Sequence, residues 1–324
     1  MENVACDLCG HDQSRHLFEA KDTNYGIPGT YPIVQCLNCD LVFQNPRPSP
    51  AEISAFYPTK TYHPFKALNQ HEAPTPTPLQ RKRAALLTSL SRVGRVLDVG
   101  CGSGLFLLAM SELGWECQGV EPNHAAAEFA AKAYQLQVQK GDIFTKKPSQ
   151  EYDLITLWDV LEHTHSPKQV LLYAEKLLRP GGILAASVPN WGGIEQRLFR
   201  ERWIAVDAPR HLYHFTISTL SALLAVCGFD SMILKTQASP LSLSNNLLRW
   251  AGDIFLRHGE SKFSSAGLDA VSNQPSLIQP RKILINTTHW LMKIPNALIS
   301  FFNQGSGILL IAHKTSEQGI WKSK

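Results

Sequence analysis

The sequence is poor in charge and has no marked excess of either sign. Its 31 lysines and arginines against 27 aspartates and glutamates leave a net charge of +4 over 324 residues. So small an excess gives no indication of nucleic-acid binding by charge alone. Apolar residues account for 44% of the chain and charged residues for 18%, so the chain can bury enough surface to offset the entropy cost of ordering it. The composition predicts a folded protein with two domains, or one large domain with appendages.

Long apolar runs are also missing. The longest candidate, 283–311, is interrupted by His289, Lys293 and Pro295 among other residues, and it does not reach the roughly 18 uncharged apolar residues of a spanning helix. The N-terminal sequence MENVACDLCG lacks the basic, apolar and small-residue pattern of a secretory signal. We therefore expect a cytoplasmic protein without a transmembrane segment, in which disulfides are disfavoured.

Cysteines are few but grouped. Four of the seven fall into two C-x-x-C pairs, a spacing typical of metal sites rather than of a disulfide framework. Each pair places two thiolates on a tight turn, and two such turns supply a closed tetrahedral shell for one zinc ion. Because no coordination position stays open, the zinc would be structural, in a zinc-ribbon-like module over residues 1–45. The four predicted ligands are Cys6, Cys9, Cys36 and Cys39.

Proline is concentrated in one stretch, 46–78, which disfavours long helices and sheet interiors and predicts a connector. From Leu79 onward, short apolar runs alternate with helical stretches, a pattern that favours a parallel α/β sheet. We expect strands over 93–99, 117–121, 152–158, 182–188, 231–236 and 307–313. The predicted domains are the module over 1–45, the connector over 46–78 and an α/β domain over 79–324 with a helical insertion at about 241–306.

A glycine-rich turn follows the first of these strands. In VLDVGCGSGLFL, Gly100, Gly102 and Gly104 let the backbone turn sharply and approach a ligand closely, just before a helix with free N–H groups. A dinucleotide fold requires G-x-G-x-x-G, whereas here the third glycine comes one residue early. Asp98 ends the strand, where it would repel a pyrophosphate and attract the ammonium of an amino acid. The turn therefore predicts a nucleotide-like cofactor that carries an amino acid group.

This turn resembles the first motif of class I S-adenosylmethionine-dependent methyltransferases. The segments 118–122, 140–143, 152–163 and 178–184 resemble later motifs of that family in the same order. The resemblance implies a Rossmann-like seven-stranded α/β sheet that binds S-adenosylmethionine. It also implies that Glu121 holds the two ribose hydroxyls, since a carboxylate can accept two hydrogen bonds from a diol, and that Asp142 meets the adenine amino group. The implied cofactor-binding residues are Asp98, Gly100, Gly102, Gly104, Glu121 and Asp142.

The cysteine module joined to this domain resembles bacterial methyltransferases found among enzymes of sugar, polysaccharide and small-metabolite modification. The D-x-x-E-H segment at 159–163 resembles ubiquinone-pathway O-methyltransferases. That resemblance allows Asp159, Glu162 and His163 to take a divalent cation. Three neighbouring ligands also suit a hydrogen-bonded turn, and we expect no metal there.

Histidines gather in two segments that we expect to be loops at the carboxyl edge of the sheet, where open α/β sheets bind ligands. His163 follows the fourth strand, and His211 and His214 lie in the segment 207–216 after the fifth. Methyl transfer to oxygen or carbon needs a base, so His211, His214 and His163 are the candidate catalytic residues. Alternatively, His163 orients the cofactor or caps a helix, and His214 is a hydrogen-bonded histidine beside a helix that begins near Thr216.

The first functional hypothesis is an S-adenosylmethionine-dependent methyltransferase that acts on a small molecule or a glycan or lipid precursor, at a hydroxyl oxygen. The alternatives are an RNA methyltransferase that grips its substrate with the zinc ribbon, and a catalytically inert cofactor-binding scaffold. No nucleic-acid partner is expected, because residues 1–45 carry no basic stripe. Arginines and aromatic residues over 191–213 suit either a phosphate-bearing substrate or a solvated helix with a packed stripe. The insertion at 241–306 is expected to be a lid or a homodimer contact, with peripheral membrane contact through 283–302 as the alternative.

Overall fold

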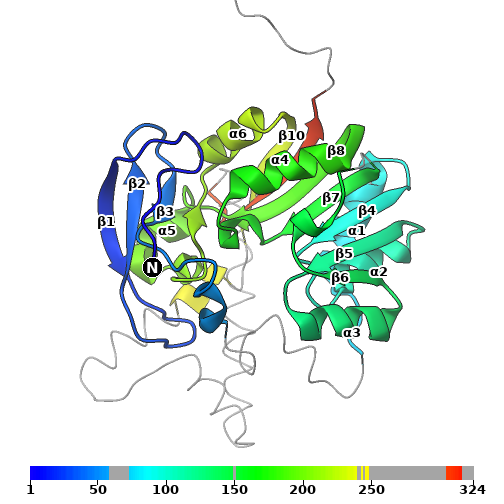
Figure 1. The fold of residues 1–324 in the computed structure, drawn as a ribbon, viewed down its shortest axis with the longest axis horizontal. Helices are drawn as coiled ribbons and strands as arrows, with labels where there is room; N and C mark the ends of the chain where they lie inside the picture. Colours follow the sequence, from blue (N-terminus) through cyan, green and yellow to red (C-terminus); the bar gives the residue numbers. More distant parts are fainter. Residues whose placement is uncertain (58–72, 149–150, 239–241, 244, 248–303, 316–324) are drawn as a thin grey trace, which may run out of the picture. The chain divides into compact units, whose positions relative to one another are not determined.

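The computed structural model describes residues 1–57, 73–148, 151–238, 242–243, 245–247 and 304–315 (Figure 1). Its packing divides the chain into two compact units. The N-terminal unit holds the described parts of Met1–Pro58, Val188–Leu220 and Lys235–Ile308. The central unit holds the described parts of Thr59–Ser187, Ser221–Leu234 and Leu309–Lys324.

A seven-stranded sheet, in the order β10-β11-β8-β7-β4-β5-β6, forms the basis of the central unit. Its strands are β4 (Arg95–Val99), β5 (Glu116–Glu121), β6 (Gln137–Lys140), β7 (Tyr152–Trp158), β8 (Leu178–Pro189), β10 (Phe229–Gln237) and β11 (Gly307–Lys314). β4 pairs in parallel with β5 and β7, β5 with β6, and β7 with β8. Parallel neighbours end at the same edge of a sheet, so the turns that follow β4, β5 and β7 meet there.

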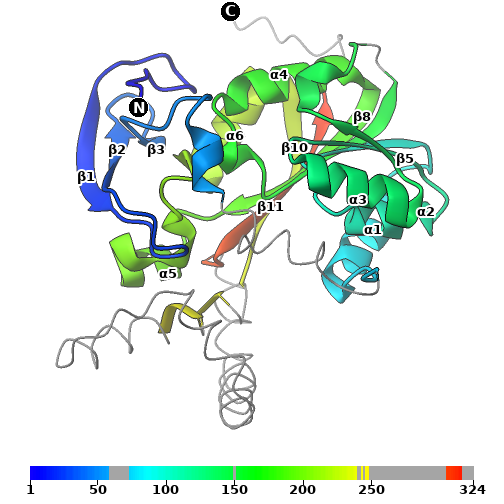
Figure 2. The same ribbon diagram turned by 60° about the horizontal axis from the view of Figure 1, so that its bottom comes forward.

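Helices follow the strands along the chain and can be traced in Figure 2. They are α1 (Pro78–Leu90), α2 (Leu105–Ser111), α3 (His124–Tyr134), α4 (Pro167–Leu177) and α6 (Ile217–Val226). Thr77 and Gln80 form a capping box at the start of α1, which satisfies backbone N–H groups that a helix start leaves unpaired. Leu87 of α1 and Leu107 and Met110 of α2 share one buried core with residues of β4, β7, β8 and β11. This core fixes both helices against the sheet.

The predicted α/β class with a seven-stranded sheet is confirmed. The six predicted strands correspond to β4, β5, β7, β8, β10 and β11, with ends that differ by a few residues. β6 is not among the predicted strands, because its sequence QVQK is polar and mostly exposed. An edge strand has a neighbour on one side only, so it needs no continuous apolar run.

The N-terminal unit contains a four-stranded sheet in the order β1-β2-β3-β9. Its strands are β1 (Ser14–Ala20), β2 (Tyr31–Cys36), β3 (Val42–Gln44) and β9 (Tyr213–His214), and each pairing is antiparallel. The unit also contains the short helices η1 (Ile53–Phe56), α5 (Ile194–Phe199), η5 (Arg200–Arg202) and η6 (Ile204–Val206). Tyr31, Ile33, Val42, Phe199 and Trp203 belong to its buried core.

Strand β9 lies inside the segment 207–216, which the sequence led us to expect as a loop. Val42 pairs with His214 and Phe43 with Tyr213, and Gln44 N donates a hydrogen bond to Leu212 O at 2.9 Å. A two-residue strand carries no alternating pattern, so no sequence signal marks it. Pairing satisfies the backbone groups that β3 would otherwise bury without partners.

The predicted boundaries at residues 45, 78, 241 and 306 stay predictions. Part of the connector 46–78 and nearly all of the insertion 241–306, including 283–302, lie outside the described residues. The predictions of a lid, a dimer contact or a membrane contact therefore fall on residues about which the structure says nothing. Within the described ranges, no helix combines the length and the apolar character needed to span a bilayer.

Candidate functional site

The glycine turn joins β4 to α2 with three glycines in the left-handed backbone region. Gly100, Gly102 and Gly104 have φ values of 69°, 55° and 81°, which residues with a Cβ adopt only with strain. A Cβ on Gly100 would lie 2.7 Å from a methyl carbon of Val160, whereas one on Gly102 would meet no atom within 4 Å. Gly102 therefore borders open space, as a backbone that lies against a ligand would.

Glu121, at the end of β5, is tied to this turn. Its Oε2 accepts a hydrogen bond from Gly102 N at 2.9 Å, and its Oε1 accepts one from Asn123 N at 2.8 Å. Burial raises the pKa of Glu121, while these two backbone hydrogen bonds oppose the shift. A carboxylate has about four acceptor positions, so one bond to each oxygen leaves capacity for two hydroxyl donors.

Asp98 lies one strand away, near the end of β4, and is 2% exposed. Thr156 Oγ1 donates a hydrogen bond to Asp98 Oδ1 at 2.6 Å. Burial raises the pKa of Asp98 to about 7, although Thr156 and the charge of Arg83 favour its ionised form. A carboxylate in this state gains from a cationic ligand, which would lower its pKa again.

Arg83 of α1 is a candidate site residue that was not predicted from the sequence. Its guanidinium lies over the Trp158 ring at 4.2 Å, and Nη2 donates to Ser187 Oγ at 3.1 Å. Nη2 also lies 3.9 Å from Asp159 Oδ2. Among the described residues, its buried Nε has no hydrogen-bond partner. An arginine in a helix that precedes the glycine motif carries no sequence signal, because only the packing of α1 brings its charge to the strand ends.

The remaining predicted residues of the central unit lie on short 3₁₀ turns. Asp142 is exposed and caps η3 (Ile143–Thr145), accepting a hydrogen bond from Phe144 N at 3.0 Å. His163 ends η4 (Leu161–His163) and is half-buried, with its N–H donating to Val160 O at 3.0 Å. His163 follows strand β7, as predicted, and Asp142 follows β6, a strand that was not predicted.

The other two predicted catalytic histidines belong to the N-terminal unit, where their ring centres lie 6.5 Å apart. His211 Nδ1 lies 2.8 Å from Ala205 O, and its Nε2 lies 3.7 Å from Asp207 Oδ2. A carbonyl oxygen only accepts, so Nδ1 carries the proton and Nε2 is the basic nitrogen. Burial alone would raise the pKa of Asp207, but His211 and Arg210 outweigh it and hold that pKa below its usual value.

His214 lies in a different environment. It is 3% exposed, and its ring centre lies 4.9 Å from that of Trp191. Burial lowers the pKa of His214 to about 3, with His211 adding to the shift and Asp207 opposing it. The imidazole is therefore neutral at physiological pH. Because its imidazolium form gives up a proton so readily, the neutral ring is a weak base.

Arg210, one of the arginines considered for a phosphate-bearing substrate, is fully buried and engaged within the N-terminal unit. Its Nη1 and Nη2 donate to Asp22 at 2.9 Å and 2.7 Å, and Nη2 also donates to Asp207 at 2.6 Å. Its guanidinium stacks on Tyr25 at 4.4 Å. Two carboxylates already neutralise this cation, so it stabilises the 207–211 segment rather than offering a charge to a ligand.

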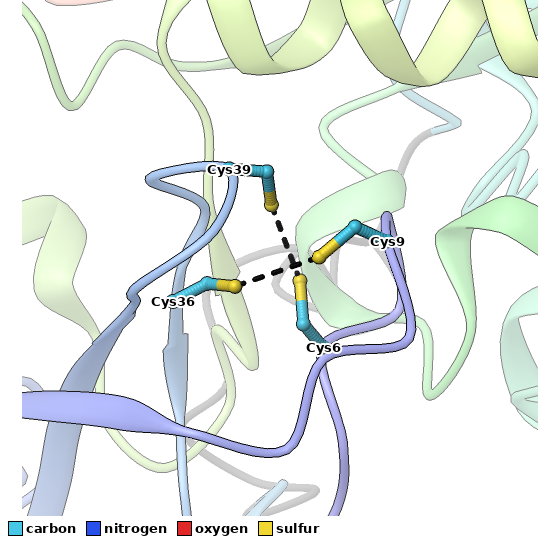
Figure 3. A group of neighbouring side chains, drawn as sticks. All are labelled: Cys6, Cys9, Cys36 and Cys39. Carbon is cyan, nitrogen blue, oxygen red and sulfur yellow. Dashed lines mark hydrogen bonds between the residues drawn. The ribbon is translucent and has the colours of Figure 1, made fainter.

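The four predicted zinc ligands converge at one point, and Figure 3 shows their sulfurs turned toward one another. Cys6 and Cys39 Sγ lie 3.5 Å apart, Cys9 and Cys36 Sγ lie 3.6 Å apart, and all four fall within 4.8 Å. A tetrahedral shell with zinc–sulfur bonds of about 2.3 Å has edges of about 3.8 Å. The cluster therefore has the size and the donor set that fit one zinc ion.

Both C-x-x-C turns have the same backbone form. Gly10 N donates to Cys6 O at 2.8 Å, and Asp40 N donates to Cys36 O at 3.2 Å. Gly10 and Asp40 have φ values of 76° and 61°, a conformation that glycine adopts freely and aspartate tolerates. Burial raises the pKa of Cys39 to about 11, so metal binding would have to displace a thiol proton there.

Comparison with known proteins agrees with this geometry. A family model described as "Methyltransferase domain" matches residues 70–234, just over half of the chain. A ubiquinone biosynthesis O-methyltransferase of Saccharophagus degradans is 32% identical over 104 residues, which cover 30% of this chain and 44% of that protein. Another, of a Bradyrhizobium strain, is 25% identical over 177 residues, which cover 52% of this chain and 70% of that protein. The chain thus spans less than half the length of the Saccharophagus relative.

Among solved structures, phosphoethanolamine N-methyltransferase 2 of Haemonchus contortus, in complex with S-adenosyl-L-methionine, has a similar fold. The TM-score is 0.53 at 15% identity, covering 85% of this chain and 63% of that chain. The glycine turn on a seven-stranded α/β sheet and the matched family model lead to one assignment. The chain belongs to the methyltransferase domain family and has the fold of class I S-adenosylmethionine-dependent methyltransferases.

Proposed function

We propose that this protein transfers a methyl group from S-adenosylmethionine to a hydroxyl oxygen of a small molecule or of a glycan or lipid precursor. The observation that carries the proposal is the tie between Gly102 and Glu121. It holds a buried carboxylate beside a glycine whose missing Cβ leaves open space. A ribose diol fits such a site, because both hydroxyls can donate to the carboxylate while the sugar lies against the bare backbone.

The amino acid part of the cofactor carries an ammonium and a carboxylate, and the central unit offers one group for each. Asp98 supplies a buried negative charge for the ammonium. Arg83 supplies a buried positive charge for the carboxylate, and the electrostatic effect of each on the other's pKa places the two groups within interaction range. A zwitterion between them would compensate both charges. Asp142, at the end of β6, stays the candidate for the adenine amino group.

The relatives named O-methyltransferases support an oxygen acceptor. When bound, S-adenosylmethionine supplies an electrophilic methyl group on a sulfonium. We infer that His211 takes the hydroxyl proton on Nε2 as the new oxygen–carbon bond forms, because Asp207 can stabilise the imidazolium that results. His214, whose pKa is about 3, suits a neutral hydrogen-bonding role better. His163 stays a candidate for either role.

We further propose that Cys6, Cys9, Cys36 and Cys39 hold one structural zinc ion. The support is the sulfur spacing together with the repeated turn that carries each pair. Four thiolate ligands leave no position for a substrate, so the ion would stabilise the hairpin of β2 and β3 rather than take part in the chemistry.

Calorimetry with S-adenosylmethionine tests the cofactor assignment. Glu121→Ala should weaken binding at least tenfold, since a hydrogen bond to a charged group contributes about 1.5–3 kcal/mol. Glu116→Ala is the matched control, because Glu116 starts the same strand β5 but is exposed and pairs with Arg95 at the surface. An affinity of Glu121→Ala within about twofold of the wild type would overturn the assignment.

A labelled-methyl assay then tests the acceptor class. The protein is incubated with methyl-labelled cofactor and, separately, with phenols, methyl glycosides and total RNA. Label on a phenol or a glycoside supports the proposal. Label on RNA alone would support the RNA methyltransferase alternative, and tight cofactor binding without transfer to any of these would support an inert scaffold.

A further inference from the structure

Two buried polar side chains of the N-terminal unit lie on the same face of its sheet. Val42 pairs with His214, and Gln44 lies two residues further along β3, so the three side chains share one face. Gln44 and His214 are thus diagonal neighbours across β3 and β9, about 7–8 Å apart at the backbone and within reach of each other through long side chains. Ile33, which pairs with Gln44, belongs to the buried core on this face together with Val42.

Neither side chain has its hydrogen-bonding groups satisfied. Gln44 is 0% exposed and His214 is 3% exposed. Among the described residues, neither amide atom of Gln44 and neither ring nitrogen of His214 has a partner. Four polar atoms on this face of the sheet are therefore buried without the hydrogen bonds that normally offset the loss of water.

Two buried side chains of the same unit, Asn190 and Glu195, show how such groups are satisfied there. Asn190 Nδ2 donates to Gly305 O at 2.8 Å, and its Oδ1 accepts from Gly192 N at 3.0 Å. Glu195 accepts hydrogen bonds from Ser242 and Asn246 at 2.5 Å and 2.9 Å. The unit thus satisfies a buried amide and a buried carboxylate at these positions, whereas no described residue satisfies Gln44 or His214.

The chemistry of the pair selects an uncharged ligand. Neutral histidine offers one donor and one acceptor, and glutamine offers two donors and a carbonyl acceptor. His214 stays neutral at physiological pH because burial lowers its pKa to about 3. Of the charged groups nearby, Arg210 is engaged by two carboxylates and Asp207 is itself negative. His211, whose ring centre lies 6.5 Å from that of His214, is itself 3.7 Å from the Asp207 carboxylate. A phosphate or carboxylate would therefore be buried here beside basic groups that carboxylates already compensate, at a large desolvation cost.

We propose that Gln44 and His214 form one binding site for a hydroxyl group of the methyl acceptor, in which Gln44 determines specificity. A hydroxyl both donates and accepts, so it can engage one group of each side chain. Trp191, whose ring lies 4.9 Å from that of His214 at 37°, limits rotation of the imidazole. The identification of the ligand as the methyl acceptor rests on the proposed function, whereas the site itself does not.

The first test measures thermal stability without ligand. Gln44→Leu should raise Tm by about 2–4 °C or leave it unchanged, since replacing an unsatisfied amide by an apolar side chain removes a destabilising group. Gln44→Met is the second variant, because its unbranched side chain matches glutamine in length. Asn190→Leu is the matched control and should lower Tm, because that amide is hydrogen-bonded. If both Gln44 variants lowered Tm as far as Asn190→Leu does, the amide would be satisfied in the free protein and the proposal overturned.

The second test follows the Gln44 side-chain amide and the His214 ring nitrogens by NMR. Methyl glucoside and catechol, at millimolar concentration, probe a sugar hydroxyl and a phenolic hydroxyl, and glucose 1-phosphate probes an anion. We expect one of the neutral probes to shift both signals in the wild type, and the His214 shift to be lost in Gln44→Leu. No shift with either neutral probe, or a larger shift with the phosphate, would overturn the proposal.

Calorimetry separates this inference from the proposed function. Gln44→Leu should bind S-adenosylmethionine as the wild type does, because Gln44 belongs to neither carboxylate site of the central unit. If the wild type failed to bind the cofactor, the proposed function would be wrong. A positive NMR result would still establish the hydroxyl site. If the cofactor bound and both neutral probes failed, only the hydroxyl site would fall.

Discussion

The guanidinium carbon of Arg83, on helix α1, lies 4.2 Å above the ring centre of Trp158, the last residue of strand β7. The guanidinium makes a cation–π contact with this ring, and its Nη2 donates a hydrogen bond to Ser187 Oγ at 3.1 Å. The cation is thus placed within electrostatic range of the buried carboxylate of Asp98. Burial lowers the pKa of Arg83, which Asp159 and Asp98 oppose, so a negatively charged ligand group at this point would be stabilising.

Arg83→Ala should weaken S-adenosylmethionine binding about 10- to 100-fold, because one charge-assisted hydrogen bond contributes about 1.5–3 kcal/mol. Arg81→Ala is the control, since Arg81 lies on the same helix but is exposed and pairs with Glu112 at the surface. Calorimetric titration of both variants gives the comparison. Equal affinities for the two variants would remove Arg83 from the cofactor site.

Asp98 should release a proton when the cofactor binds between pH 6 and 7. Its pKa is raised to about 7 by burial, so much of the free protein carries a proton on this carboxyl in that range. An ammonium beside it favours the ionised form, since an ordinary α-amino group keeps its charge below about pH 7.7–8.0. Titrations in buffers of different ionisation enthalpy measure the proton count. Asp98→Asn should abolish the release, and an unchanged proton count in that variant would assign it to another group.

The raised pKa of Asp98 also predicts how the stability of the free protein depends on pH. A carboxyl whose folded-state pKa is raised contributes stability that is complete below the unfolded value, near 3.8, and is lost as pH rises to about 7. Asp98→Asn does not ionise, and its amide oxygen can still accept from Thr156. Its Tm relative to the wild type should therefore increase from pH 5 to pH 8, as measured by calorimetry. A constant difference would show that Asp98 is not the titrating group.

Purified protein should contain one zinc ion per chain. Cys6→Ser/Cys39→Ser should lose the zinc and melt at a lower temperature, because the four sulfurs join the turn before β1 to the turn between β2 and β3. Cys227→Ser is the control, since that buried thiol lies outside the cluster. Metal analysis and Tm give both readouts. Full zinc content and an unchanged Tm in the double variant would rule out the zinc site.

With a hydroxyl acceptor in hand, His211→Ala should lower kcat by about 10²- to 10⁴-fold while leaving cofactor affinity unchanged. The physical reason is the loss of Nε2 as proton acceptor beside Asp207. His16→Ala, at an exposed histidine of β1, is the control. His214→Ala should instead act mainly on KM. Equal turnover in the two single variants and the double variant would exclude both histidines and return attention to His163.

The strands of the central unit and the residues of the proposed cofactor site were predictable from the sequence alone. Apolar runs separated by helical stretches specify a parallel sheet, because buried strands need continuous apolar residues on both faces. The glycine turn and Glu121 could also be found in the sequence, since left-handed φ values favour glycine and Glu121 ends an apolar run that forms β5, beside β4. The two C-x-x-C pairs likewise specify their own turns.

Other features depend on long-range contacts that became visible in the folded structure. Arg83 joins the proposed cofactor site because α1 packs on the same core as α2, a long-range contact that no local pattern encodes. Gln44 and His214 lie 170 positions apart in the numbering, and a two-residue pairing between β3 and β9 brings them onto one face. Their burial without partners is likewise invisible in the sequence. Backbone pairing between distant segments uses N–H and C=O groups, and every residue type except proline carries both. The identity of the side chains therefore does not predict which segments will pair.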